Sequence, residues 1–188
     1  ILWEIDQTDI EFSNGVFRSI KEHELKLSIK ELAEKLDITG GTVSTTSSVN
    51  IAAGGNGYAG HICALDIDPE TGKTDVVRYT AVQDVGTAIH PSYAEGQIQG
   101  GVVQGIGWAL NEEYFMSDDG KVINSSLLDY RMPTSLDLPM IDPIVIEVPN
   151  PGHPFGVRGI GESPLVPPLA AVANAVHDAT GIRMLKLP

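Results

Sequence analysis

The sequence predicts an α+β fold in which mixed or antiparallel sheet segments pack against helices. Strand-like alternation bounded by turn residues fills the middle of the chain, and apolar residues recur at helical spacing in separate segments. Of the 188 residues, 42% are apolar, which is enough to build a buried core. No uninterrupted apolar run reaches about 18 residues, so we expect no transmembrane helix.

The N-terminal region is rich in charge, and the segment that follows it has none. Residues 1–37 hold 14 of the 37 charged residues, and we interpret them as a solvated cap. Ser28 and Glu31 have the spacing of a capping box, which predicts a short amphipathic helix over Ile29–Leu36. The neutral stretch that follows is rich in Gly, Ser and Thr over 42–57. We expect a buried loop there rather than a surface linker, and we consider it a further candidate cofactor loop.

The remaining elements follow from alternation, turn residues and helical spacing. In order, they are a strand over His61–Asp68, a turn at 69–73, a strand over Thr74–Val85, a loop over 84–91, a helix over Ala94–Glu113, a strand through Ile144, Ile146 and Val148, and a last helix from about Leu169 to Gly181.

The helix over 94–113 contains five glycines, at 96, 100, 101, 105 and 107. Each interior glycine costs about 0.5–1 kcal/mol relative to alanine, so this helix must pack closely against backbone or a ligand. Gln97 lies in its first turn, and its amide can donate and accept hydrogen bonds to a heterocyclic cofactor. Helix–helix packing through small residues is the alternative, and the glycines taken alone favour it.

A second glycine-rich motif, Gly156–Pro164, surrounds Glu162. The carboxylate is predicted at a helix N-terminus, which favours its ionised form, and burial among neutral side chains would raise its pKa. Balancing these effects could give a general base. The alternative is a first-turn residue that only satisfies the helix dipole, and composition alone favours it.

Charge and residue types exclude several classes of function. The net charge of −13 argues against nucleic-acid binding. Cys63 is the single cysteine, so it cannot form an internal disulfide; this is consistent with a reducing compartment, and we expect a cytoplasmic protein. The histidines are scattered, so we expect no metal site built from side chains. The sequence has neither a P-loop nor a nucleophile elbow.

Several motifs occur in order and together resemble a known family. They are residues 9–18, the 66–72 hairpin, 83–91, Gly96–Gly107 and Gly156–Pro164. With these motifs the chain resembles the C-terminal part of the molybdenum-binding large subunit of the xanthine dehydrogenase/aldehyde oxidase family. The resemblance implies a molybdopterin-binding domain of that type, in which Glu162 matches the active-site glutamate and Gln97 matches a glutamine that contacts the cofactor. We assign Gly100 and Gly161 to the cofactor-binding site as well.

The resemblance also implies a function. It is that of a molybdenum hydroxylase, which oxidises an aldehyde or N-heterocycle with oxygen from water. The expected cofactor is molybdopterin, as such or in a dinucleotide form, with 2Fe-2S clusters and FAD only on partner domains or subunits. The other expected partners are the remainder of the molybdenum subunit and a small-molecule substrate.

Large subunits of the family are several times longer than this chain, so we expect a piece of a longer polypeptide or a processed subunit that is inactive in isolation. Within it, residues 1–37 would be a peripheral cap, and 38–188 would hold the cofactor-binding and catalytic-glutamate region. Two other functions stay open: a non-catalytic assembly module of the same fold whose partner holds the metal, and an unrelated acidic α+β binding domain.

Overall fold

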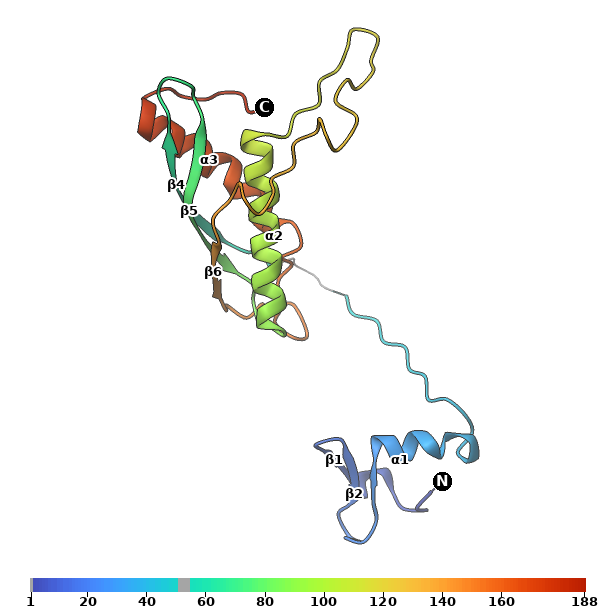
Figure 1. Cartoon of the computed structure of the whole chain (residues 1–188). Helices are drawn as coiled ribbons and strands as arrows, with labels where there is room; N and C mark the ends of the chain where they lie inside the picture. The colour runs from blue at the N-terminus through green and yellow to red at the C-terminus, as the bar shows by residue number, and fades with distance from the viewer. Residues whose placement is uncertain (1, 51–54) are drawn as a thin grey trace. The chain divides into compact units, whose positions relative to one another are not determined.

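The computed structural model describes residues 2–50 and 55–188, and the chain forms two compact units that divide at Asn50 (Figure 1). The first unit is a three-stranded antiparallel meander followed by a helix. Its elements are the 3-10 turn η1 (Gln7–Asp9), β1 (Ile10–Ser13), β2 (Val16–Ser19), β3 (Lys26–Ser28), α1 (Ile29–Glu34) and the 3-10 turn η2 (Leu36–Ile38). Asn14 and Gly15 join β1 to β2 with positive φ angles of 51° and 74°, the conformation that tight hairpin turns require.

The predicted capping box is present at the start of α1. The Ser28 hydroxyl accepts from the Glu31 backbone N–H at 3.2 Å, and the Glu31 carboxylate accepts from the Ser28 N–H at 2.8 Å. The helix ends two residues earlier than predicted, because Lys35 leaves helical geometry and a 3-10 turn follows. Leu32 and Leu36 line an apolar groove of about 330 Å³ in this unit.

The second unit places two helices on one face of a mixed sheet (Figure 1). The sheet order is β4 (Ala59–Ile67), β5 (Thr74–Asp84) and β6 (Ile141–Ile146); β4 runs antiparallel to β5, and β6 runs parallel to it. The helices are α2 (Pro91–Leu110) and α3 (Val166–Thr180), with the 3-10 turn η3 (Ser163–Leu165) directly before α3. The expected α+β class is confirmed.

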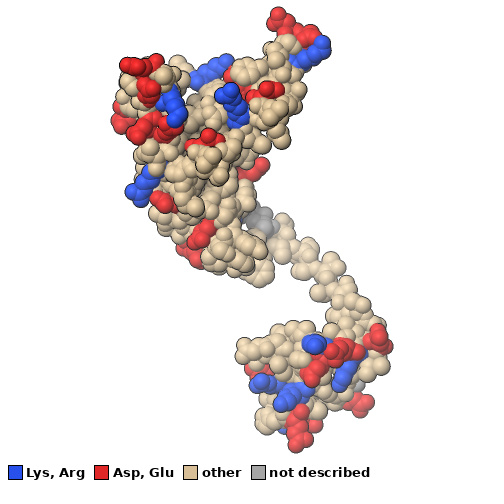
Figure 2. Space-filling view, viewed as in Figure 1, with Lys and Arg blue, Asp and Glu red and all other residues tan. Residues whose placement is uncertain are grey.

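The core lies between the sheet and the helices. Tyr79 and Ala81 of β5 are fully buried on the face that the helices cover, and they pack with Ile98, Val102 and Val172. Figure 2 shows that charged side chains of this unit gather toward the β4–β5 turn and the tip of the 111–140 segment. Among the helices of the described ranges, none combines the length and the apolar character that a membrane span requires.

Further predictions about local structure need correction. The strand expected through Val148 ends at Ile146, and the last helix begins at Val166 rather than at about Leu169. The helix expected at Ala94–Glu113 spans Pro91–Leu110 instead, because Pro91 suits a first helical turn and the Asn111 N–H closes the end onto the Gly107 carbonyl at 2.8 Å. The neutral segment expected to be buried is exposed at 42–50 and 55–58, because its glycines, serines and threonines offer little apolar surface to bury. Residues 51–54 of that predicted loop lie outside the described residues.

Candidate functional site

The two motifs singled out from the sequence meet in the second unit. The side-chain amide of Gln97, near the N-terminus of α2, donates to the Gly161 carbonyl at 2.5 Å across 64 positions of sequence. Gly161 immediately precedes Glu162, so the contact brings the helix motif to the residue beside the predicted base. Both Gln97 and Glu162 are exposed.

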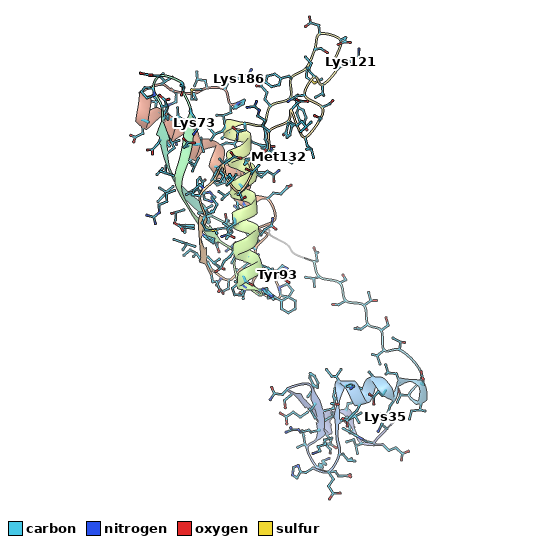
Figure 3. The ribbon with its side chains drawn as sticks, viewed as in Figure 1. Lys35, Lys73, Tyr93, Lys121, Met132 and Lys186 are labelled. Carbon is cyan, nitrogen blue, oxygen red and sulfur yellow. The ribbon has the colours of Figure 1, made fainter. Side chains whose placement is uncertain are left out.

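A groove of about 390 Å³ lies along this contact. Gln97 and Gly161 are among its lining residues, and so is an aromatic pair: the rings of His90 and Tyr93 stack with centroids 3.9 Å apart and planes 12° apart. Figure 3 shows Tyr93 at the N-terminal end of α2. The remaining lining residues are mostly apolar and come from the loop after β5 and from 157–160. The groove therefore combines apolar walls, an aromatic surface, one side-chain amide and the side chain of Arg158.

Glu162 occupies the position before η3 but does not cap it. Its backbone has φ −125° and ψ −2°, and its carboxylate makes no capping hydrogen bond. The carboxylate is exposed rather than buried among neutral side chains, because the preceding glycines offer no side chain to cover it. The start of a helix just beyond it was predicted correctly, whereas the burial expected at Glu162 is not found in this chain.

Four of the five glycines of α2 form two groups, and the fifth, Gly107, is crowded by Glu112 and Pro133 of the following segment. A Cβ added to Gly101 would lie 2.9 Å from the Pro164 Cβ, and one added to Gly105 would lie 2.6 Å from the Leu165 carbonyl oxygen. These two glycines pack the helix against η3 and α3, as the small-residue alternative requires. In contrast, a Cβ added to Gly96 or Gly100 would have no neighbour within 4 Å, so the helix backbone is open to an approaching ligand there. Gly161 is open in the same way.

The structure adds an ion pair that sequence analysis missed. The Nε of Arg158 lies 2.9 Å from an oxygen of Asp84, and the two side chains are only 10% and 9% exposed. Each is a single charged residue inside a neutral motif, Gln83–Gly86 and Gly156–Gly159. The presence of opposite charges in the two motifs was the only signal in the sequence, and it does not specify a contact.

A second polar cluster lies inside the sheet–helix layer. His61 Nδ1 is 3.0 Å from the Tyr79 hydroxyl, and burial lowers the pKa of His61 to about 4. Burial also raises the pKa of Cys63 to about 11, so the thiol stays protonated. Within the described ranges, no three His, Cys, Asp or Glu residues gather into a group able to hold a metal ion.

Comparisons with known proteins identify the family of this chain. The family model described as "Molybdopterin cofactor-binding domain" matches residues 1–139. The putative xanthine dehydrogenase molybdenum-binding subunit of Escherichia coli K12 is 38% identical over 150 residues, which is 79% of this chain and 20% of that protein. The nicotine 6-hydroxylase large subunit of Paenarthrobacter nicotinovorans is 43% identical over 120 residues, covering 64% of this chain and 15% of that protein.

Solved structures give the same result. Quinoline 2-oxidoreductase from Pseudomonas putida 86 matches with a TM-score of 0.73 and 33% identity, covering 96% of this chain and 24% of that chain. This chain therefore spans about a fifth of the length of these relatives. The match of a family model to most of its residues, and the identity over most of its length, show that the chain belongs to the molybdopterin cofactor-binding domain family of xanthine dehydrogenase/aldehyde oxidase molybdenum-binding subunits.

Proposed function

We propose that this chain supplies the catalytic base and part of the cofactor cradle of a molybdenum hydroxylase. The reaction would oxidise an aldehyde or an N-heterocycle with oxygen from water. Glu162 would be the base, and Gln97, Gly100 and Gly161 would contact molybdopterin. In this proposal 1–37 is a peripheral cap, and 38–188 holds the cofactor-binding and catalytic residues.

The hydrogen bond between Gln97 and Gly161 carries this proposal. It joins the helix motif to the glutamate motif at a groove, although neither motif alone indicates chemistry more strongly than packing. A packing role for the glycines of α2 would account for Gly101 and Gly105, but it does not account for Gly100, where an added Cβ would meet nothing within 4 Å.

The residues around the groove fit a molybdopterin. A pterin is a flat heterocycle with alternating donors and acceptors, and a side-chain amide such as that of Gln97 can satisfy both kinds. Gly96 and Gly100 leave room for close approach to the helix backbone, since an added Cβ would meet nothing within 4 Å. When bound, the cofactor would supply the redox chemistry, and the protein supplies binding and orientation.

The part assigned to Glu162 is proton acceptance. Its carboxylate makes no capping hydrogen bond, so its oxygens are free to accept a proton from the group that attacks the substrate. A residue engaged in capping η3 would have to break that bond first. The exposed position in this chain also leaves the carboxylate accessible to substrate and cofactor.

The test is Glu162→Gln in the complete molybdenum subunit with its partners. The substitution keeps the shape of the side chain and removes proton acceptance, so kcat should fall about 10²–10⁴-fold while molybdenum content stays at the parent level. Glu95→Gln is the matched control, because Glu95 is an exposed carboxylate on α2 with no assigned role. It should leave turnover unchanged.

Near-parent turnover of the metal-loaded Glu162→Gln enzyme would reject the assignment and favour the non-catalytic assembly module. If turnover and molybdenum are lost together, reconstitution with excess cofactor distinguishes the two effects. If turnover returns when the molybdenum is restored, Glu162 is not the base. If turnover stays absent at full molybdenum content, the result supports Glu162 as the base.

The wider setting belongs to the same proposal. The remainder of the molybdenum subunit would complete the active site, and 2Fe-2S clusters and FAD would reside on partner domains or subunits. The relatives include subunit gamma of the 6-hydroxypseudooxynicotine dehydrogenase complex of Paenarthrobacter nicotinovorans, which supports the expectation of partner subunits. We propose a cytoplasmic location for the present protein, consistent with its single cysteine.

A further inference from the structure

The buried Arg158 side chain connects three segments of the second unit. Its Nε lies 2.9 Å from the Asp84 carboxylate at the end of β5 and 3.3 Å from the Val148 carbonyl after β6. Its Nη1 donates to the Asn56 carbonyl at 2.7 Å, just before β4. One guanidinium therefore ties the glycine-rich motif to the chain next to all three strands of the sheet.

Asp84 engages the same region through its other oxygen. Oδ1 accepts from the Gly86 N–H at 2.9 Å and from the Val148 N–H at 3.4 Å. The carboxylate is thus bonded to the loop after β5 and to the segment after β6, as well as to Arg158. Because a buried ion pair is stable only when its remaining hydrogen-bonding groups are satisfied, this arrangement is the kind that can persist in an interior.

The backbone around the pair is held just as closely. The Arg158 N–H donates to the Val85 carbonyl at 2.9 Å, and the Thr87 N–H donates to the Gly156 carbonyl at 2.9 Å. Gly86 has φ 68°, and a Cβ added there would lie 2.3 Å from the Gly156 oxygen, so only glycine permits this approach. The motif is therefore fixed up to Arg158.

Between Arg158 and Glu162, Ile160 packs against the core, and the residues on either side of it have few restraints. Added Cβ atoms at Gly159 and Gly161 would meet nothing within 4 Å, so these residues have little packing to define their conformation. The polar contacts found there are Gln97 with Gly161 at 2.5 Å and Ser163 with the Gly159 carbonyl at 3.4 Å. A glycine segment with this freedom needs a fixed start if the carboxylate at its end is to have a defined position.

We propose that the Arg158–Asp84 pair is a positioning device for Glu162. It fixes the start of the segment 158–162, and thereby sets where the carboxylate lies next to Gly161, which lines the groove. The inference rests on the proposed function of Glu162 as the base. Buried ion pairs add little net stability compared with apolar replacements, so a geometric role accounts for this pair better than a stabilising one.

The test uses the complete enzyme and variants that avoid leaving one buried charge alone. Arg158→Met would leave Asp84 unpaired in the interior and could prevent folding, so the main variant is the neutral double substitution Asp84→Asn with Arg158→Met. Arg158→Lys is the second variant, because it keeps the charge but cannot make all three guanidinium contacts. The control is Arg78→Met, which removes an ion pair with Asp142 whose side chains are 74% and 47% exposed.

Two readouts decide the proposal: amide hydrogen exchange over 159–162, and kcat separately from KM at equal molybdenum content. We expect faster exchange and a kcat about 10²-fold lower in the double variant, with KM within about twofold, because misplacement of a catalytic group by about 1 Å costs that much. Arg158→Lys should lie between the parent and the double variant. Arg78→Met should match the parent in both readouts.

Unchanged exchange over 159–162 in the double variant would overturn the positioning role, whatever the turnover. The positioning role would also be overturned if the double variant exchanged faster but kept the kcat of the parent, provided that Glu162→Gln inactivates the same enzyme. If the double variant does not fold, the same readouts on Arg158→Lys decide. Failure of the proposed function is a separate result, seen as turnover retained in Glu162→Gln itself.

Discussion

Glycines lie on two sides of α2 in opposite surroundings, crowded on one side and open on the other. On one side, Gly101 and Gly105 admit η3 and α3 so closely that a Cβ would collide with backbone or proline atoms. On the other side, an added Cβ at Gly96 or Gly100 would meet nothing within 4 Å. Glycines of one helix can thus be tightly packed or open within three turns, and only the tertiary neighbours distinguish the two states.

The largest expected effect comes from filling the packed side. Gly105→Leu adds a side chain where a Cβ alone would lie 2.6 Å from the Leu165 carbonyl oxygen and 2.8 Å from Pro168 Cβ. Overpacking of this kind costs about 1–3 kcal/mol and sometimes more, and here backbone would have to move, so we expect about 3 kcal/mol. Thermal unfolding of the cofactor-free subunit measures the loss.

Gly100→Leu is the control for that experiment, since it adds the same side chain on the open side of the helix. Its unfolding temperature should remain near that of the parent or rise slightly. Equal losses in the two variants would contradict the division of α2 into a packed and an open side.

The second prediction concerns the open side. Gln97→Ala removes the amide that donates to the Gly161 carbonyl. If that amide also binds the cofactor, a buried polar group of the cofactor loses its hydrogen-bond partner, at a cost of about 1–3 kcal/mol. Molybdenum retained after dialysis should therefore fall by about tenfold or more. Gln104→Ala is the control, because Gln104 is another exposed glutamine of α2 outside the groove lining. Unchanged molybdenum retention in Gln97→Ala would show that Gln97 only packs against Gly161 and does not contact the cofactor.

Much of the fold was predictable from local sequence signals. The Ser28–Glu31 capping box and the stop at Gly181, which has φ 75°, were read correctly because each depends on neighbouring residues alone. The start of α2 was placed three residues late, although Pro91 is a first-turn residue and was available as a signal. The parallel pairing of β6 with β5 was not predictable, because it joins segments about 60 residues apart.

The site was predictable as two motifs but not as one place. Gln97, Gly161 and Glu162 were identified by residue type and resemblance, and their assignments stay predictions. The Arg158–Asp84 pair was missed because nothing local to either residue indicates a partner 74 positions away. The open or packed state of each glycine depends on η3 and α3, so the sequence left that question undecided as well.

The third prediction concerns His61, a half-buried residue of β4. Burial lowers the pKa of His61 to about 4 from its ordinary 6.5, so between these values the unfolded chain binds a proton that the folded chain excludes. The contribution of neutral His61 to the free energy of unfolding is fully present above about pH 6.5 and is lost as pH falls toward 4. Allowing for solvent screening of a half-buried group, we expect a loss of about 1–2 kcal/mol.

His61→Gln removes this titration while its amide can still bond the Tyr79 hydroxyl, so the unfolding temperature should depend less on pH between 4 and 6.5. His23→Gln is the control, because His23 is exposed in the first unit. A pH dependence that His61→Gln leaves intact would assign the loss to other groups.

The smallest expected effect makes the sharpest comparison between the two sides of α2. Gly100→Ala adds a methyl group that meets nothing within 4 Å, so the gain in helix propensity should stabilise the cofactor-free subunit by about 0.5–1 kcal/mol. Gly101→Ala, one residue along, places its methyl group 2.9 Å from Pro164 Cβ and 3.2 Å from the Leu165 nitrogen, and should lower stability. If Gly100 also contacts cofactor, the alanine that stabilises the empty subunit should reduce molybdenum retention. Higher stability with lower molybdenum retention in the same Gly100→Ala preparation would indicate that the position is kept as glycine for the ligand. Higher stability with full molybdenum retention would show that the cofactor does not contact the helix at Gly100.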